Sequence, residues 1–162
     1  SFQPDEEAAA KLFGELSLKY PQHYFGQLAF LNYATITLYT QPDLAAIGEA
    51  LYRIEEEGRF LSIPDISRNY FRLMGETHVY YGVSKRKGED FFVAAMEVGF
   101  VRPALRAKML LRLAELARSR GDFPVAKQYY EQILVEFTRS RYLYITQKRL
   151  ESLLMQIAEV RD

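Results

Sequence analysis

Few residues of this chain could do acid–base or metal chemistry. It has two histidines, His23 and His78, and no cysteine. A histidine can act as a general base or bind a metal ion, whereas a chain without cysteine has no disulfide, no reactive thiolate and no cysteine-bound metal. His23 follows Pro21 at a turn and is expected on the surface. His78 is expected to be a half-buried, hydrogen-bonded core residue and not a metal ligand or a general base.

Two charged stretches could bind an ion or a phosphate. The acidic run 55–57 consists of three glutamates, and the segment SKRKGED at 84–90 contains three basic residues. Successive helical residues point about 100° apart, so the three carboxylates do not converge on one metal ion. The basic residues of 84–90 are followed at once by two acids, which weakens attraction to phosphate. We therefore expect a solvated helix face at 55–57 and a solvated polar turn at 84–90.

No catalytic motif accompanies these residues. The sequence contains no H-E-x-x-H, no G-x-S-x-G, no P-loop and no G-x-G-x-x-G. These patterns are the short signatures of zinc hydrolases, serine hydrolases, nucleotide-binding proteins and dinucleotide-binding proteins. We therefore expect a protein that is not an enzyme and that has no cofactor and no metal site.

The amino-acid composition and the charge of the chain further limit the class of protein to which it could belong. Of the 162 residues, 49% are apolar and 26% are charged, which suits a packed core of one domain or a short repeat array. The formal net charge is zero, unlike that of most nucleic-acid-binding proteins. Residues 1–81 nevertheless carry −5 and residues 82–162 carry +5. This asymmetry indicates either two solvated faces or a bipolar surface that orients a partner or stacks head to tail.

Apolar residues recur at the helical period along the whole chain, and Pro, Gly and Asp separate the periodic segments. No long segment shows the period of two that is typical of strands. The pattern predicts an all-α protein of about eight helices. Their expected ranges are 5–19, 22–40, 43–57, 65–83, 89–100, 104–120, 124–137 and 141–160.

The pair 104–120 and 124–137 is the best defined. Gly121 suits the end of the first helix, Asp122 can cap the second, and Pro124 suits its first turn. So short a turn requires the two helices to pack antiparallel.

Spacings within this pair recur elsewhere in the chain. Leu110, Leu113, Ala114 and Ala117 have the spacing 0, 3, 4, 7, and Ala126 is followed by Tyr130 four residues later and Thr138 twelve residues later. The second half recurs at Ala9, Phe13 and Pro21. The first half recurs at Phe71, Met74, Gly75 and His78, and more weakly at Phe25, Leu28, Ala29 and Asn32. This pattern resembles the tetratricopeptide repeat.

The resemblance implies a right-handed α-solenoid of antiparallel helix hairpins in a single domain, 1–162. Its parts would be a truncated repeat at 5–21, units at about 22–57, 65–100 and 104–138, and a capping helix at 141–160. In such repeats small residues such as Gly75 let helices approach, and aromatic residues such as Phe25 fill the space beside them. The unit 65–100 departs from the family, because its connection at 81–90 is long. A related helical repeat or an irregular bundle is the alternative.

In this family the first helix of each hairpin lines a concave groove, so the resemblance also implies groove residues. These would be His23, Phe30, Tyr33, Asn69, Arg72, Glu76, Tyr80, Lys108, Arg112, Glu115 and Arg118. Within this set Lys108, Arg112 and Arg118 could hold an acidic peptide by charge-assisted hydrogen bonds. Ordinary solvated helix residues are the alternative.

The resulting hypothesis is a non-catalytic scaffold or adaptor that binds another protein, a peptide or a second copy of the chain. One alternative is a cell-envelope assembly or transport accessory protein that binds a lipid-like ligand between helices, and another is a self-assembling structural subunit. The segment 129–153 also resembles tetratricopeptide-type lipoproteins of the bacterial envelope, which favours a periplasmic or outer-membrane-associated location over the cytoplasm. The chain begins with Ser1, so a signal peptide or lipid anchor would lie upstream. No apolar run is long enough for a membrane span.

Overall fold

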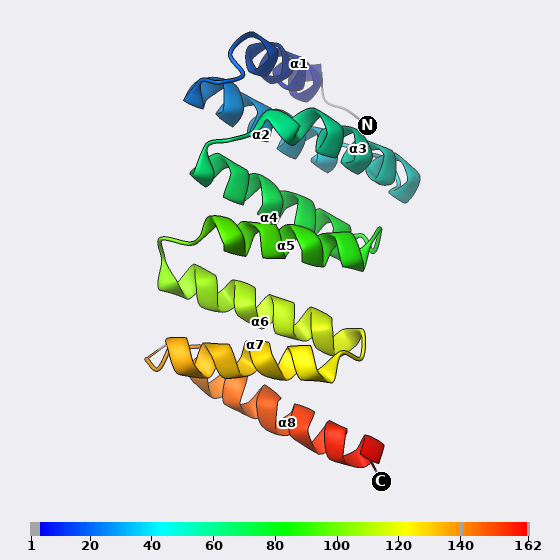
Figure 1. Cartoon of the computed structure of the whole chain (residues 1–162). Helices are drawn as coiled ribbons and strands as arrows, with labels where there is room; N and C mark the ends of the chain where they lie inside the picture. The colour runs from blue at the N-terminus through cyan, green and yellow to red at the C-terminus, as the bar shows by residue number, and fades with distance from the viewer. Residues whose placement is uncertain (1–3, 140, 162) are drawn as a thin grey trace. The chain divides into compact units, whose positions relative to one another are not determined.

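The computed structural model describes residues 4–139 and 141–161. These residues form eight α-helices and one short 3-10 helix and contain no strand, which confirms the all-α prediction. The elements are α1 (Pro4–Lys19), α2 (Tyr24–Tyr39), α3 (Leu44–Glu57), η1 (Gly58–Phe60), α4 (Pro64–Tyr80), α5 (Lys85–Val98), α6 (Pro103–Ser119), α7 (Phe123–Glu136) and α8 (Leu143–Arg161). They are labelled in Figure 1.

Helices α3 and α7 each begin after an aspartate that caps the first turn. The side chain of Asp43 accepts the N–H of Ala46 at 2.9 Å at the start of α3, and Asp122 accepts the N–H of Val125 at 3.3 Å at the start of α7. Each carboxylate satisfies one of the N–H groups that a first helical turn leaves without a partner. Gly121 has the positive φ of 82° that suits a helix-ending glycine.

The polar segment 84–90 is not the turn that its composition predicts. Helix α5 begins at Lys85, and the Ser84 hydroxyl accepts the N–H of Lys87 at 3.2 Å. Gly88, interpreted as a turn glycine, lies inside the helix, where a Cβ would come within 2.6 Å of Val79. The sequence interpretation was wrong because a glycine that permits close helix packing cannot be told from a turn glycine by its neighbours.

The chain divides into two compact units, Ser1–Val98 and Gly99–Asp162. Unit 1 contains helices α1 to α5, and unit 2 contains α6 to α8. The predicted single repeat domain over 1–162 stays a prediction.

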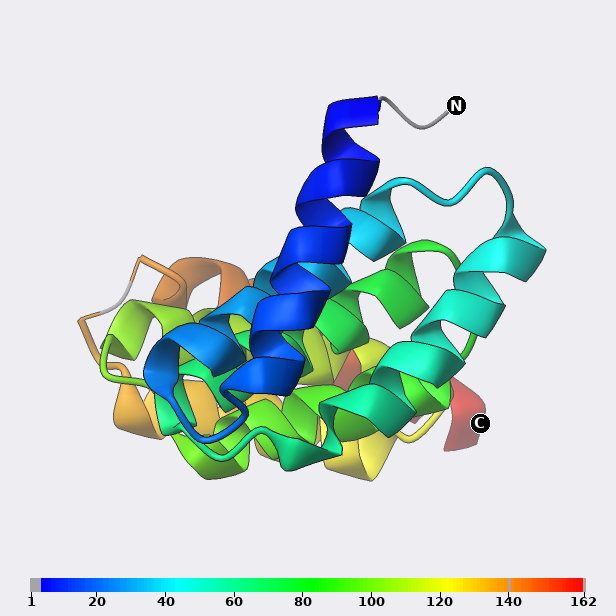
Figure 2. The same ribbon diagram turned by 90° about the horizontal axis from the view of Figure 1, so that it is seen from above.

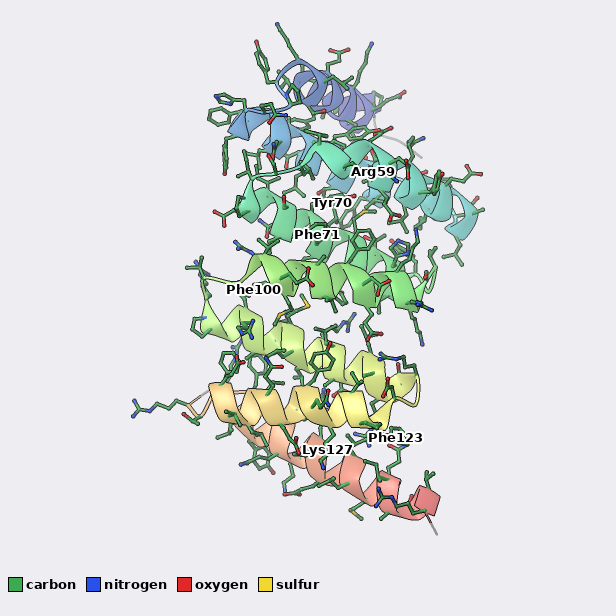
Figure 3. The ribbon with its side chains drawn as sticks, in the orientation of Figure 1. Arg59, Tyr70, Phe71, Phe100, Phe123 and Lys127 are labelled. Atoms are coloured by element: carbon green, nitrogen blue, oxygen red, sulfur yellow. The ribbon has the colours of Figure 1, made fainter. Side chains whose placement is uncertain are left out.

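In unit 1, α1 packs against α2, α4 packs against α5, and α2 also contacts α4. Figure 2 shows α1 lying over α2. The core of the unit lies among α2, α3 and α4 and consists of Phe30, Ala34, Leu38, Ile47, Ala50, Leu51, Ile54, Tyr70 and Met74. Phe30, predicted for the groove, is therefore a core residue. The hydroxyl of Tyr70, labelled in Figure 3, donates to the Ile54 carbonyl of α3 at 3.4 Å, and burial raises the pKa of this tyrosine.

Glycines permit the closest helix contacts of unit 1. A Cβ on Gly75 would lie 2.6 Å from the Phe92 ring and 3.0 Å from the Gly88 carbonyl oxygen, which confirms the predicted close approach. Near the start of α2, a Cβ on Gly26 would lie 1.7 Å from the carbonyl oxygen of Tyr20, which follows α1. Phe25, predicted to fill space between helices, is instead 70% exposed, so that prediction was wrong.

A buried glutamine joins α2 to the start of α4. Gln27 is fully buried, and its side-chain oxygen accepts the N–H groups of Ser62 and Ile63 at 3.0 and 2.9 Å. Its amide group donates to the Pro21 carbonyl at 3.0 Å and to the Ser62 hydroxyl at 3.0 Å. Ile63 is the N-cap residue of α4 and supplies no capping side chain, so Gln27 binds this turn from outside the helix.

In unit 2, α7 packs against both α6 and α8. Ala114 of α6 and Ala126 of α7 are fully buried, as the repeat pattern predicts for its small positions. Tyr130 of α7 and Leu153 of α8 are fully buried as well. At the other end of the helix pair, Arg106 of α6 makes a two-pronged ion pair with Glu136 of α7 at 2.9 and 3.3 Å, and these hydrogen bonds lower the pKa of that carboxyl.

Candidate functional site

A groove of about 420 Å³ lies in unit 1, where α2 and α4 end. Its lining consists of Leu38, Tyr39, Leu73, Glu76, Thr77, Tyr80 and Tyr81. Tyr39 is the last residue of α2 and Tyr80 is the last residue of α4. The shared core of α2, α3 and α4 holds these two helix ends together, because it includes Leu38 on one side and Met74 on the other.

Tyrosine rings form much of the accessible lining. Tyr39 and Tyr80 are each 80% exposed, and Tyr81 is 37% exposed. The rings of Tyr80 and Tyr81 meet edge to face, with centroids 4.8 Å apart and an interplanar angle of 85°. Exposed tyrosines offer a large apolar face and a polar hydroxyl at a small cost in side-chain entropy, which is why they are enriched at binding interfaces.

Glu76 supplies the formal charge among the lining residues. It lies one helical turn before Tyr80, so the two side chains project from the same face of α4. The Thr77 hydroxyl donates to the Leu73 carbonyl at 2.7 Å, within the helix. The groove therefore combines aromatic faces, an apolar base and an acidic side chain.

Seven residues of this unit were predicted to line a groove, and the structure brings two of them together here, Glu76 and Tyr80. Asn69 is exposed and Arg72 is partly buried on α4, but neither belongs to this lining. Tyr33 is partly buried in α2 beside Gly14 of α1, and burial, reinforced by Glu57, raises its pKa.

His23, another of these seven residues, is exposed as predicted and caps α2. Its Nδ1 accepts the N–H of Phe25 at 3.2 Å, and its ring stacks on the Phe25 ring with centroids 5.5 Å apart. A second hollow of about 300 Å³ lies here, lined by His23, Phe25, Gly26, Leu16 and Tyr20. His23 thus belongs to the turn between α1 and α2 and not to the tyrosine-lined groove.

In unit 2 the predicted groove residue Glu115 lies in a hydrogen-bond network. Its Oε1 accepts the Tyr130 hydroxyl of α7 at 2.7 Å and an Arg149 N–H of α8 at 2.6 Å. Burial, together with the hydrogen bond to Glu115, raises the pKa of Tyr130 to about 12. Glu115 therefore links all three helices of the unit.

Arg118 belongs to the same internal system. Its guanidinium donates to Gln156 Oε1 at 3.1 Å, to Ser152 Oγ at 3.0 Å and to the Arg149 carbonyl at 3.3 Å, all on α8. Lys108 is exposed on α6 and Arg112 is partly buried. The three residues of the predicted basic cluster therefore differ: Lys108 faces solvent, whereas Arg118 is bound to α8.

His78 is a core residue, as predicted, but not a hydrogen-bonded one. It is 4% exposed, and neither ring nitrogen has a hydrogen-bond partner among the described residues. Its ring stacks on Phe91 with centroids 5.8 Å apart. Burial lowers the pKa of His78 and nearby Lys87 lowers it further, while Glu55 opposes them. Lys87 and Glu55 pair with each other at 2.8 Å.

Among the residues that the structure describes, no group of three or more His, Asp or Glu side chains could hold a metal ion. None of its helices is both long and apolar enough to cross a membrane.

Sequence reasoning missed Tyr39, Tyr81, Leu38, Leu73 and Thr77 as groove residues. Tyr39 and Tyr80 are separated by all of α3, and repeat spacing gives no distance between helices that are not consecutive. The sequence offered one signal for this groove, which is the presence of aromatic residues at helix ends. Tyr80 and Tyr81, at the end of α4, are an example.

The comparisons with known proteins give no relative for this chain. No protein-family model, no curated protein and no solved structure matches it.

Proposed function

We propose that this protein is a non-catalytic scaffold that binds another protein through its helical surface. Eight helices in close succession, with consecutive pairs packed together, support an α-solenoid of antiparallel hairpins similar to tetratricopeptide repeats. Repeats of this kind bind partners along helix faces and need no catalytic residues.

The observation that carries the proposal is the tyrosine-lined groove of unit 1. Tyr39 and Tyr80 are each 80% exposed, so two large aromatic faces of the groove are open to a partner. A groove of about 420 Å³ is wide enough for one or two side chains of a bound segment. The binding surface in this proposal is therefore the end of α2 and the end of α4.

Site-specific photo-cross-linking tests the proposal. A photoreactive phenylalanine analogue replaces Tyr80, and the protein is irradiated in cells of its source. We expect a cross-linked partner of discrete mass that mass spectrometry identifies. The matched control carries the analogue in place of Tyr52, which is 66% exposed on α3 and does not line the groove. Equal products at both positions, or none at Tyr80, would contradict the proposal.

Self-assembly is the second candidate function, and the charge of the two units favours it. Residues 1–98 carry 9 Lys and Arg against 14 Asp and Glu, a net charge of −5. Residues 99–162 carry 12 against 7, a net charge of +5. Opposite net charges on two parts of one chain attract when copies meet head to tail.

Light scattering separates this candidate from the first. Self-assembly through charge gives a mass that rises with protein concentration at about 50 mM salt and returns to the monomer at about 500 mM salt. A monomer under both conditions excludes it.

A further inference from the structure

We propose that the outer face of helix α1 binds the same face of a second copy of the chain, with the two α1 helices antiparallel. The inference goes beyond the proposed function, because no described residue of α1 belongs to the tyrosine-lined groove. It also differs from head-to-tail assembly. Two copies of one surface meet, so the assembly closes at two copies.

Helix α1 has a covered side and an outer face. It packs against α2, which lies beneath it in Figure 2, and Ser17 on the covered side is 4% exposed. On the outer face Leu12 is 56% exposed and Leu16 is 36% exposed, and Ala8 is exposed one turn before Leu12. Residues four apart in a helix are neighbours, so these three side chains form a continuous apolar stripe.

A charged residue lies at each end of the stripe. Asp5 precedes Ala8 by three residues and Lys19 follows Leu16 by three, so both project from the outer face. Both are exposed, and neither forms an ion pair within the part of the chain that the structure describes. The Lys19 ammonium lies 5.4 Å from the centre of the Tyr20 ring, and an exposed ammonium in that position can still pair with a carboxylate.

The outer face is complementary to itself. Its five residues are spaced 3, 4, 4 and 3 positions apart, so the spacing is the same in both directions from the central one, Leu12. In an antiparallel pair with the two-fold axis at Leu12, Asp5 of each copy lies opposite Lys19 of the other. Ala8 of each copy lies opposite Leu16 of the other, and the small side chain leaves room for the large one. The pair therefore has two identical ion pairs around an apolar centre.

The same charges exclude the parallel arrangement. Two parallel α1 helices would set Asp5 against Asp5 and Lys19 against Lys19, and like charges in contact are unfavourable. Residues 1–98 of each copy carry a net charge of −5, which opposes the approach of two such units. At about 150 mM salt, exposed charges more than about 8 Å apart are largely screened, whereas partly buried pairs are screened much less. The ion pairs across α1 therefore act where the long-range repulsion is weak.

Sedimentation equilibrium of the whole chain at about 150 mM salt tests the inference. Helix α1 has 16 residues and is about 24 Å long, so one helix pair makes a small interface. We expect a monomer–dimer equilibrium with a Kd on the order of 100 μM. A chain that is monomeric at about 500 μM would overturn the inference, and so would a mass that keeps rising beyond two copies.

Exchange of the two charges tests the arrangement of the helices. In Asp5→Lys two lysines meet at each end of the dimer, and in Lys19→Asp two aspartates meet, so each variant should dimerise about tenfold more weakly. The variant with both substitutions has opposite charges in contact again and should regain the wild-type Kd. A mixture of the two single variants should form a mixed dimer with the wild-type Kd. If neither the double variant nor the mixture recovers, the antiparallel pairing is wrong.

Two matched controls separate the interface from effects on the helix. Glu6→Lys also removes an acid from the first turn, but Glu6 lies about 100° around the helix from Asp5 and off the outer face, so the Kd should stay within about twofold. Leu12→Glu brings two carboxylates together at the axis and should weaken dimerisation at least about tenfold. Leu18→Glu, at a residue that is 84% exposed and off the stripe, should not. Circular dichroism verifies that each variant keeps its helix content. Equal weakening by the two leucine substitutions would reject the stripe as the contact.

Discussion

Units 1 and 2 use different residues where their helices pack closely against one another. In unit 1, glycines at positions 26, 75 and 88 let backbones approach so closely that a Cβ would meet a neighbour within 2.6 Å or less. In unit 2 the two glycines, Gly99 and Gly121, have positive φ and no neighbour close to a would-be Cβ. Its helices approach through buried alanines and are joined by the polar network around Glu115.

The difference extends to where the charged side chains are used. In unit 2, Glu115 and Arg118 were predicted to face a partner, but they bind the helices of their own unit. In unit 1, Glu76 and Tyr80 remain at an accessible groove. Residues that were predicted to line one groove therefore serve packing in some cases, such as Glu115 and Arg118, and stay accessible in others, such as Glu76 and Tyr80. The comparison also places the binding proposal in unit 1.

The largest expected change in stability comes from a substitution that disrupts the close glycine contacts of unit 1. In Gly26→Ala the new methyl group would lie 1.7 Å from the backbone oxygen of Tyr20, which cannot move without displacing the turn between α1 and α2. We expect a loss of about 3 kcal/mol in the free energy of unfolding, measured by urea denaturation followed by circular dichroism. Gly14→Ala is the control, because its methyl group would make ordinary contact with Tyr33 at 3.5 Å. That control should gain about 1 kcal/mol from helix propensity. Similar losses in both variants would show that close approach is not the cause.

The next effect tests the polar network of unit 2. Arg149→Met removes the charged donor that α8 offers to Glu115 at 2.6 Å. The pair is 37% exposed on each side, so solvent screens it and we expect a loss of about 1 kcal/mol. Lys148→Met, at a neighbouring residue that is 57% exposed, should change stability by less than about 0.5 kcal/mol. If the two variants lose the same amount, the network does not join α8 to α6.

A smaller effect concerns the buried histidine of unit 1. The folded state holds the pKa of His78 below the unfolded value of about 6.5. At a pH between the folded and unfolded pKa values, the unfolded chain therefore binds more protons than the folded chain. Lowering the pH from about 7.5 to about 5.5 should therefore reduce stability. His78→Phe should show a smaller reduction over the same range in urea denaturation. A wild-type dependence of stability on pH in His78→Phe would contradict the assignment to this histidine.

The smallest effect is expected at the groove itself. Tyr80→Ala removes a side chain that is 80% exposed, so the free energy of unfolding should stay within about 0.5 kcal/mol of the wild type. Tyr52→Ala on α3 serves as the comparison for stability. A large loss in Tyr80→Ala alone would show that the ring supports the fold, and the binding proposal would lose its main observation.

The sequence by itself predicted the helices and several of their caps. Apolar periodicity reports which face of a segment is buried, and Asp43 and Asp122 act on N–H groups within three residues, so both signals are local. The small residues Gly75, Ala114 and Ala126 were also identified, because close helix crossing requires a small side chain whatever the partner is. His78 was predicted to lie in the core because the resemblance to the repeat puts it at the position of a packing tyrosine.

The tertiary structure decided everything that depends on helices far apart in the chain. In the structure, Gly88 lies where two helices cross, and the Gln27 side chain accepts a backbone N–H at the start of α4. The Arg118 side chain donates hydrogen bonds to α8. The tertiary structure also brought Tyr39 to Tyr80 across the intervening helix α3. Sequence spacing determines which residues share a face of one helix, but the distance between two such faces is set by the packing of the side chains between them.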